Sequence, residues 1–169
     1  MCSSDLIDVA NVNEGPNGIA LSGSTVAENA SGAVIGTLSV TDPDAGDTQT
    51  LNVSDNRFEV VDGQLKLKDG VSLDYEAEPQ VSVTVTATDA GGLSTTQTFS
   101  IDVANVNEGP ASVGLSNASV AENASGAVIG TLSVSDPDAG DTHSLAVSDN
   151  RFEVVDGQLK LKDGVSLDH

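Results

Sequence analysis

Apolar and polar residues alternate with a period of two along most of this chain. Between residues 80 and 88 every second residue is valine or alanine, and the residues between them are mostly serine or threonine. Residues 95–104 and 64–68 show similar alternation. Successive side chains of a strand point to opposite faces, so this pattern predicts strands with one buried face.

Short runs rich in Gly, Asp, Asn and Pro separate these stretches, as strand-connecting turns require. We predict seven strands in the first half of the chain, at 18–27, 33–40, 49–53, 57–61, 64–68, 80–88 and 95–104. This density of short strands predicts an all-β fold of Greek-key, immunoglobulin-like β-sandwich type. The expected core consists of Val34, Leu38, Val40, Leu51, Phe58, Val60, Leu65, Leu67, Leu73, Val83, Val85, Phe99 and Ile101. A true immunoglobulin domain is excluded, because the chain has one cysteine and no tryptophan.

The chain repeats itself. Residues 7–16 recur unchanged at 101–110, and 26–74 align without a gap with 120–168. Within the longer match four positions differ: Thr41/Ser135, Gln49/His143, Thr50/Ser144 and Asn52/Ala146. We therefore predict tandem repeats. The expected division is an N-terminal fragment and junction at 1–16, repeat 1 at 17–104, a linker at 105–110, and an incomplete repeat 2 at 111–169 that lacks its last two strands.

Charge narrows the classes of partner. The formal net charge is −20, with 26 acidic and 6 basic residues. Nucleic acid is excluded as a natural partner because phosphate contacts need Lys and Arg. The acidity indicates either a solvating surface or ligands for cations. The basic residues are Arg57, Lys66, Lys68 and their copies. They indicate either a solvated hairpin or a basic stripe that contacts acidic faces of neighbouring molecules.

Enzymatic activity is not expected. The sequence contains no serine elbow, no zinc-ligand spacing and no phosphate-binding loop. The turn at 42–47 also fails as an EF-hand loop, because Gly46 stands where a ligand belongs and Val53 where the loop needs Glu.

Five short acidic motifs recur in a fixed order. They are Ala27-Glu28-Asn29, Asp42-Pro43-Asp44, Leu73-Asp74-Tyr75-Glu76, Ala87-Thr88-Asp89 and the linker Asn105-Val106-Asn107-Glu108-Gly109-Pro110. The set resembles a cadherin repeat, specifically the bacterial cadherin-like repeat of large surface adhesins. That family's pattern runs x-E-N, D-x-D, L-D-R-E, A-x-D and D-x-N-D-N-x-P. The resemblance covers residues 7–168.

The resemblance implies calcium as the cofactor, since Ca²⁺ takes about six to eight oxygen ligands, mostly carboxylates and carbonyls. At the linker 105–110 the implied ligands are Glu28, Asp74, Glu76, Asn107, Glu108, Asp136 and Asp138. A matching half-site, shared with an upstream repeat, would use Asn13, Glu14, Asp42, Asp44 and Asp89. It further implies an extracellular or cell-surface location, with neighbouring repeats and other surface proteins or glycans as partners.

Some positions depart from the family pattern. Tyr75 replaces an arginine that is not a ligand, whereas Asn105 and Glu108 stand where the family often has aspartate, and the linker is one residue shorter. These changes imply fewer or weaker ions. An alternative stays open: the Asp-rich stretches are good turn formers, so the repeats could be passive spacers of immunoglobulin-like or VCBS type without a metal.

Overall fold

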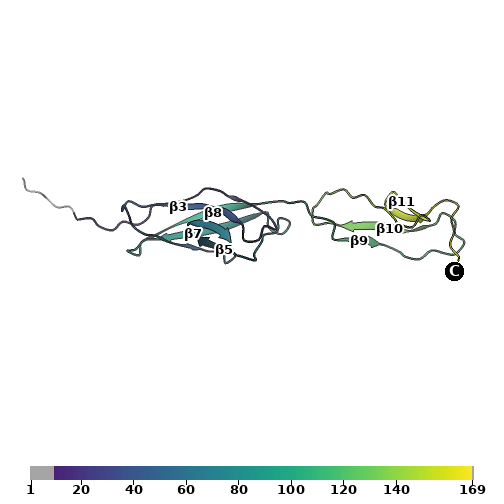
Figure 1. Ribbon diagram of the computed structural model, residues 1–169, viewed down its shortest axis with the longest axis horizontal. Coiled ribbons are helices and arrows are strands. Elements are labelled where there is room, and N and C mark those ends of the chain that lie inside the picture. The colour runs from purple at the N-terminus through teal and green to yellow at the C-terminus, as the bar shows by residue number, and fades with distance from the viewer. Residues whose placement is uncertain (1–9, 169) are drawn as a thin grey trace, which may run out of the picture. The chain divides into compact units, whose positions relative to one another are not determined.

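The computed structural model describes residues 10–168, which fall into two compact units. Unit 1 is Met1–Val106 and unit 2 is Asn107–His169 (Figure 1). The first nine residues of the predicted N-terminal segment, and His169, lie outside the described residues. All regular elements in the described part of both units are β-strands, as the alternating pattern predicted.

Two four-stranded sheets form unit 1. One has the order β1 (Gly18–Leu21), β3 (Val34–Thr41), β6 (Gln64–Leu67), β5 (Phe58–Val61), and all of its pairs are antiparallel. The other has the order β2 (Thr25–Ala27), β8 (Ser94–Ala104), β7 (Gln80–Thr88), β4 (Thr50–Val53). In this second sheet β2 runs parallel to β8, and the other pairs are antiparallel. Residues of both sheets bury one shared apolar core, so unit 1 is a β-sandwich.

The prediction of a single strand over 18–27 was wrong. The chain leaves the first sheet after β1 and joins the second as β2, so residues 10–106 form eight strands instead of the predicted seven. Gly23 marks the crossing, because a Cβ there would lie 2.6 Å from the carbonyl oxygen of Ile35. Only glycine tolerates so close a backbone approach.

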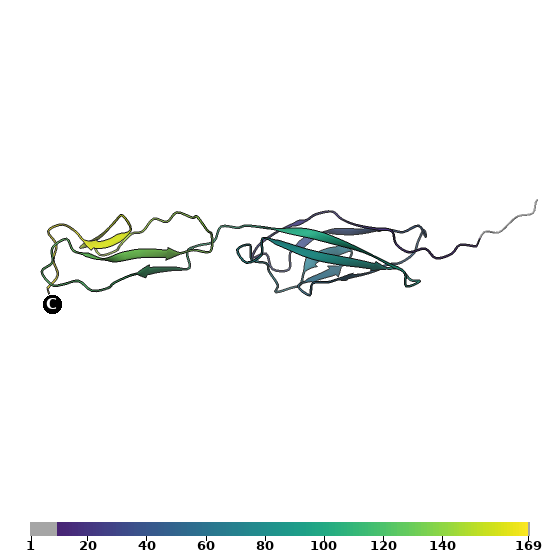
Figure 2. The same cartoon turned by 180° about the vertical axis from the view of Figure 1, so that it is seen from behind.

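The hairpin of β7 and β8 is the longest paired element of unit 1 (Figure 2). Its register runs without a break from Gln80 opposite Asp102 to Thr88 opposite Ser94. On β7 the alternate apolar residues are at most 1% exposed, whereas the serine and threonine residues between them face outward. The alternation therefore predicted both the strand and its buried face. We call residues 75–106, which contain this hairpin, the β7–β8 ribbon.

The core differs from the predicted one at a few positions. Val34 is 50% exposed and its neighbour Ile35 is 7% exposed. The pairing of β3 with β6 shifts register between Val34 and Gly36, and this irregularity changes which residue points inward. Val40, Leu51, Val60 and Phe99 are only partly buried. The structure adds to the predicted core Val26, Ile35, Val81, Ala87 and Val103.

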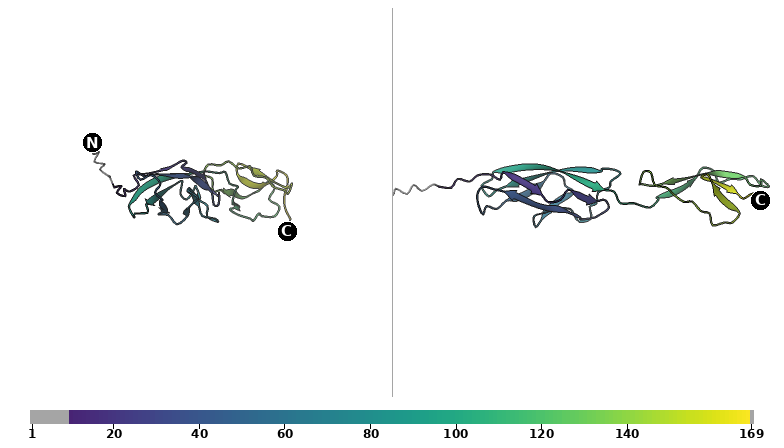
Figure 3. Two further views of the ribbon diagram at one scale, coloured as in Figure 1. Left: turned by 60° about the vertical axis from the view of Figure 1, so that its left-hand side comes forward. Right: turned by 90° about the horizontal axis from the view of Figure 1, so that it is seen from above.

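Unit 2 contains one sheet in its described residues, 107–168 (Figure 3). Its order is β11 (Phe152–Val155), β12 (Gln158–Leu161), β10 (Val128–Ser135), β9 (Ser112–Leu115). These strands are the counterparts of β5, β6, β3 and β1. Residues 119–121 and 144–147, the counterparts of β2 and β4, lie outside regular strands.

Candidate metal sites

Glu28 is a buried carboxylate that organises one end of unit 1. It follows β2, whose last residue pairs with the last residue of β8, so its side chain lies beside the segment that leaves the sandwich. Glu28 is 3% exposed. Its Oε2 accepts the amide N–H of Tyr75 at 2.9 Å, and its Oε1 accepts that of Val106 at 2.8 Å. The carboxylate thus ties the Leu-Asp-Tyr-Glu motif to the start of the linker.

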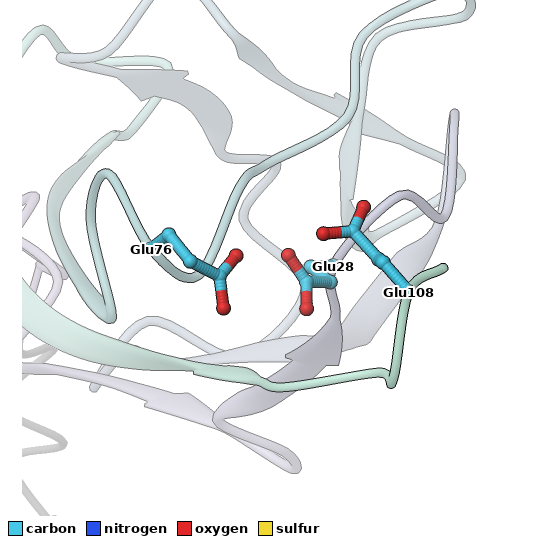
Figure 4. A group of neighbouring side chains, drawn as sticks. All are labelled: Glu28, Glu76 and Glu108. Atoms are coloured by element: carbon cyan, nitrogen blue, oxygen red, sulfur yellow. The ribbon is translucent and has the colours of Figure 1, made fainter. Parts of the chain in front are cut away.

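Glu76 brings a second carboxylate to the same place. Oxygens of Glu28 and Glu76 come within 4.8 Å of each other (Figure 4), and Glu76 also accepts a 3.1 Å hydrogen bond from the Asn105 side chain. The third residue labelled in Figure 4, Glu108, follows the last residue of unit 1 by two positions. Asp74 is exposed and caps its own turn, accepting the amide N–H of Ala77 at 3.0 Å.

A second group of carboxylates gathers near the N-terminal segment of unit 1. Oxygens of Asp42, Asp47 and Asp89 all lie within 4.8 Å of one another. Asp42 and Asp47 belong to the turn after β3, and the buried Asp89 follows β7. The strand ends therefore carry these three side chains from distant parts of the sequence to one site.

The predicted residues Asn13, Glu14 and Asp44 lie around this group. The amide N–H of Glu14 donates to Asp44 at 2.6 Å, and the Asn13 side chain donates to Asp89 at 2.9 Å. The Asn11 side chain donates to the other oxygen of Asp44 at 2.7 Å. Residues 11–14 thus contact two of the predicted ligands, although Asp44 itself is not part of the three-carboxylate group.

These hydrogen bonds favour the ionised carboxylates. The Glu14 amide and the Asn11 side chain lower the pKa of Asp44. Burial acts to raise the pKa of Asp89, but the Asn13 side chain and the backbone amides of residues 91–93 outweigh it, and the net pKa is lowered. Deprotonated carboxylates are the form that binds a metal ion.

Sequence reasoning missed Asp47. Its Oδ2 is buried and has no hydrogen-bond partner, and such an atom calls for an explanation because burial without a partner is costly. One signal was available: Asp47 closes the stretch 42–47, which recurs with the same residues at 136–141.

Unit 2 carries a related but different group, in which Asp136 and Asp141 are the copies of Asp42 and Asp47, and Asp138 is the copy of Asp44. Oxygens of Asp136, Asp138 and Asp141 lie within 4.8 Å of one another. The Asp136 side chain is 6% exposed, and its Oδ2 has no hydrogen-bond partner. The Nε2 of His143 lies 3.6 Å from this oxygen. In unit 1 the residue at the matching position, Gln49, donates to Asp42 at 3.2 Å.

The linker residues of unit 2 lie against this group of carboxylates. Asp138 is 8% exposed and accepts the amide N–H of Glu108 at 2.6 Å, as Asp44 accepts that of Glu14 in unit 1. The Asn107 side chain donates to the carbonyl oxygen of Glu108 at 3.0 Å. The acidic turn and the Asn-Glu-Gly-Pro segment therefore make the same contact in both units.

Comparison with known proteins supports one family. Residues 23–104 match the model of the cadherin domain, and that match spans all the strands of unit 1 from β2 to β8. These residues are a module of the cadherin superfamily. Protocadherin gamma-C3 of Homo sapiens and of Pan troglodytes is 36% identical to the chain over 148 residues, which covers 79% of this chain. The chain spans 16% of the length of these relatives.

Solved structures agree on the cadherin fold. The EC1-2 fragment of human protocadherin-24 gives a TM-score of 0.65 at 21% identity, over 92% of this chain and 80% of that one. The EC21-23 fragment of human CDH23 gives 0.63 at 22% identity, over 95% of this chain and 57% of that one. At this level of identity the likeness concerns the fold, which is the predicted cadherin-type β-sandwich.

The comparisons also limit one prediction and support another. The curated relatives are from animals, so they do not support the bacterial adhesin attribution. Another matching structure is described as extracellular cadherin domains of protocadherin gamma B7. The cadherin module is accordingly assigned to the extracellular or cell-surface space, as the sequence resemblance implied. Across residues 10–168 no helix has the length and apolar character needed to cross a membrane.

Proposed function

We propose that this chain is a calcium-binding extracellular module of a cell-adhesion protein. The observation that carries the proposal is the group of Asp42, Asp47 and Asp89, whose oxygens lie within 4.8 Å of one another. One of these oxygens, Oδ2 of Asp47, is buried without a hydrogen-bond partner. Three carboxylates packed this closely repel one another unless a cation or a proton neutralises them.

The residues fit calcium by the chemistry of their donor atoms. Every candidate ligand in this group is a carboxylate oxygen, which suits a hard cation, and no thiolate or imidazole takes part. A bound Ca²⁺ would supply positive charge that neutralises the repulsion. Asp42, Asp47 and Asp89 would hold it in unit 1, and Asp136, Asp138 and Asp141 would hold an ion in unit 2.

The linker is included in the proposal. Glu28 and Glu76 form a carboxylate pair at the end of unit 1, and Glu108 follows Val106 by two residues. Two residues of extended chain span at most about 7 Å, so covalent connection alone keeps Glu108 near Glu28. We expect Ca²⁺ bound by these residues, with Asp74, Asn107, Asp136 and Asp138 as further ligands, to stiffen residues 105–110.

The direct test is thermal unfolding of the chain in calcium, in magnesium and in a chelator. A ligand at 100 times its Kd adds about 2.7 kcal/mol to the folded state. We expect a rise in Tm that is specific to calcium. Superimposable melts in the three conditions would contradict the proposal.

Matched variants test which residues bind calcium. Asp47→Asn keeps the size of the side chain but removes charge from the group, so it should weaken calcium binding in isothermal titration calorimetry. Asp62→Asn is the control, because Asp62 occupies the exposed turn between β5 and β6. For the linker, Glu108→Ala should alter both the calcium affinity and the distribution of interdomain angles in small-angle scattering.

One observation favours the second candidate, a passive spacer. Several oxygens of the acidic turn already have protein donors, since Asp44 accepts from Asn11 and Glu14, and Asp42 accepts from Gln49. A turn stabilised in this way needs no metal. The same melts separate the two functions, because a spacer predicts no response to calcium.

The adhesive partner belongs to the same proposal. One similar structure is described as a cis-dimer of protocadherin gammaB7 EC3-6. We infer that a second ectodomain is the class of partner to test first, with cell-surface glycans as the other class. Analytical ultracentrifugation in calcium and in chelator would detect self-association.

A further inference from the structure

One edge of the unit 1 sandwich lacks the usual protection against pairing with another chain. β4 ends the sheet of order β2-β8-β7-β4, and within residues 10–106 no strand pairs with its free side. Natural sheet edges commonly carry charged residues, proline or a bulge, which discourage pairing. β4 has the sequence Thr-Leu-Asn-Val, and its register with β7 runs without a shift, so it has none of these features.

The free side of β4 presents unpaired backbone groups. The amide of Ser54 donates to the carbonyl oxygen of Thr84 at 3.0 Å, so the backbone groups of Ser54 face β7. Along an antiparallel strand, the backbone groups of successive residues face alternate sides. The N–H and C=O groups of Leu51 and Val53 therefore face away from β7, where a further strand could bind them.

A groove between β4 and β5 lies beside these groups. Its volume is about 380 Å³, and its lining includes Leu51, Val53, Phe58, Val60 and Lys68. The partly buried side chains of β4 are those of Leu51 and Val53. A strand paired to β4 would direct its own alternate apolar side chains into this groove, because paired strands place their side chains on shared faces.

The distribution of charge favours a second copy of this chain as the partner. Residues 49–61 and 64–68 contain two acidic and three basic residues, the latter being Arg57, Lys66 and Lys68. The rest of unit 1 contains acidic residues and no basic one. Two copies of an acidic chain repel each other over most of their surface. This repulsion is smallest where β4, β5 and β6 lie.

The charges at the two ends of β4 favour one direction of pairing. The acidic turn at 42–47 precedes β4. Arg57 follows β4, and Lys68 lies beside it, since the amide of Lys68 donates to the carbonyl oxygen of Arg57 at 2.9 Å. Antiparallel pairing of two β4 strands places the basic end of each beside the acidic turn of the other, whereas parallel pairing brings like charges together.

We propose that unit 1 binds a second copy of itself by antiparallel pairing of β4 with β4. The two-fold axis passes beside Asn52, so Leu51 of each copy exchanges backbone hydrogen bonds with Val53 of the other. The side chains of these residues then fill the two grooves. This inference rests on the proposed function for the class of partner, a second ectodomain, and it requires no calcium at the carboxylate groups.

The pairing is measured by sedimentation equilibrium of the 169-residue chain. The contact is small, so the dimer should be weak, and concentrations up to about 1 mM are needed. We expect a monomer–dimer equilibrium both in calcium and in chelator. Amide hydrogen exchange at low and high concentration should show new protection at Leu51 and Val53, whose amides face solvent in the monomer.

Charged residues at position 52 test the two-fold axis. Asn52 is exposed, so its replacement should leave unit 1 folded. Asn52→Asp and Asn52→Lys each place like charges opposite each other and should weaken the dimer at least about threefold. An equal mixture of the two variants places opposite charges there and should associate more strongly than either variant alone.

Two further substitutions complete the test. Ser39→Asp adds the same charge at an exposed position of β3 and should change the affinity by less than about twofold. Lys68→Glu removes a cation from the basic end of β4 and should weaken the dimer about threefold. The same change at its copy, Lys162→Glu, lies outside unit 1 and should have a smaller effect.

Three results would overturn the proposal. The first is a chain that stays monomeric up to about 1 mM. The second is a mixture of the Asn52→Asp and Asn52→Lys variants that associates no better than each alone. The third is association that protects amides elsewhere and leaves those of Leu51 and Val53 unchanged. A monomeric chain whose Tm still rises in calcium would refute this contact alone, whereas a dimer without a calcium response would refute the metal function alone.

Discussion

Units 1 and 2 share a segment, 26–74 and 120–168, that differs at only four positions, and parts of this segment have different structures in the two units. Residues 25–27 form β2, and 50–53 form β4, whereas the copies at 119–121 and 144–147 form no regular strand. The first pair of segments differs only at Thr25/Ser119, and the second differs at Thr50/Ser144 and Asn52/Ala146; the three residues of unit 1 are exposed. Strand formation at these places is therefore not decided by the local sequence.

The difference follows from the hydrogen-bonding partner. β2 pairs only with β8, and β4 pairs only with β7. The strands of unit 2, β9 to β12, pair with one another. An extended segment without a neighbouring strand leaves its backbone groups to water, so it gains nothing from regular strand geometry.

The largest difference between the units should appear in amide hydrogen exchange. The amides of Ser54 and Glu28 donate to Thr84 and Ala104 of the ribbon. Their copies Ser148 and Glu122 should exchange at least about a hundredfold faster, because protection depends on a stable hydrogen-bonded partner.

Asn29 and Asn123 provide the internal control for that experiment. Both donate to the matching leucine carbonyl, at 3.0 and 2.9 Å, without using the ribbon. Their exchange rates should be much closer to each other. Equal exchange at Ser54 and Ser148 would show that unit 2 forms a β4-like strand without the ribbon.

Core truncation should cost more in unit 1 than in unit 2. Leu65→Ala removes a side chain that is 0% exposed and should destabilise unit 1 by about 2–5 kcal/mol. Leu159→Ala acts at a half-buried copy of that residue, so the loss should be clearly smaller. Hydrogen exchange under partly denaturing conditions reads the two units separately.

A second pair of leucines controls the measurement. Leu67 and Leu161 are both 0% exposed, so their alanine variants should destabilise their own units by similar amounts. A similar loss for Leu65 and Leu159 as well would mean that the second sheet adds little to the core.

Glu28 and Glu122 test the polar end of the sandwich. Glu28→Ala leaves two amides without their acceptor and should cost about 1–3 kcal/mol in the absence of calcium. Glu122→Ala changes an exposed side chain and should stay within about 0.5 kcal/mol. Chemical denaturation in chelator measures the loss of unfolding free energy in both variants. Equal losses would show that the Glu28 carboxylate does not stabilise unit 1.

The smallest effect concerns two arginines at equivalent positions. Arg57 pairs with Asp55 at 2.7 Å and with Glu78 at 2.6 Å, whereas Arg151 pairs with Asp149 at 2.7 Å and stacks on Phe152. Because the Arg57 pairs are partly exposed, we expect a loss of about 0.2–1 kcal/mol for Arg57→Ala and a smaller loss for Arg151→Ala.

The stability that these arginine–aspartate pairs contribute should depend on pH. Arg57 lowers the pKa of Asp55, and Arg151 lowers the pKa of Asp149 to about 2. A carboxyl whose pKa falls on folding stabilises the protein above its unfolded pKa of about 4, and this contribution disappears as the pH falls further. Acid melts should therefore show the effect of Arg151→Ala at pH 6 and almost none at pH 2.

The sequence predicted the candidate site better as a set of motifs than as a set of contacts. It named Asp42 and Asp89, which the fold brings within 4.8 Å, but it overlooked Asp47. Turn propensity explains an aspartate at that position equally well, so only burial of its Oδ2 without a partner distinguishes it. The ligand set implied by the family resemblance is still a prediction.

Local turns are what the sequence determined by itself. Asn29 and Asn123 both have φ of 58°, and the Asp-Gly hairpins place Asp62 at 50° and Asp156 at 49°. Such conformations depend on residues a few positions apart, which are identical in the two units. The alternating pattern likewise determined the buried face of β7 before any partner was known.

The tertiary structure alone decided which segments became strands and which carboxylates met. Strand pairs and carboxylate groups join residues that are far apart in sequence, as β2 with β8 and Asp42 with Asp89 show. A segment's own sequence cannot specify whether its partner is in place. The segments that form β2 and β4 in unit 1 are therefore irregular at 119–121 and 144–147 in unit 2. Likewise Phe58 and Leu65 are buried in unit 1, whereas their copies Phe152 and Leu159 are half-buried.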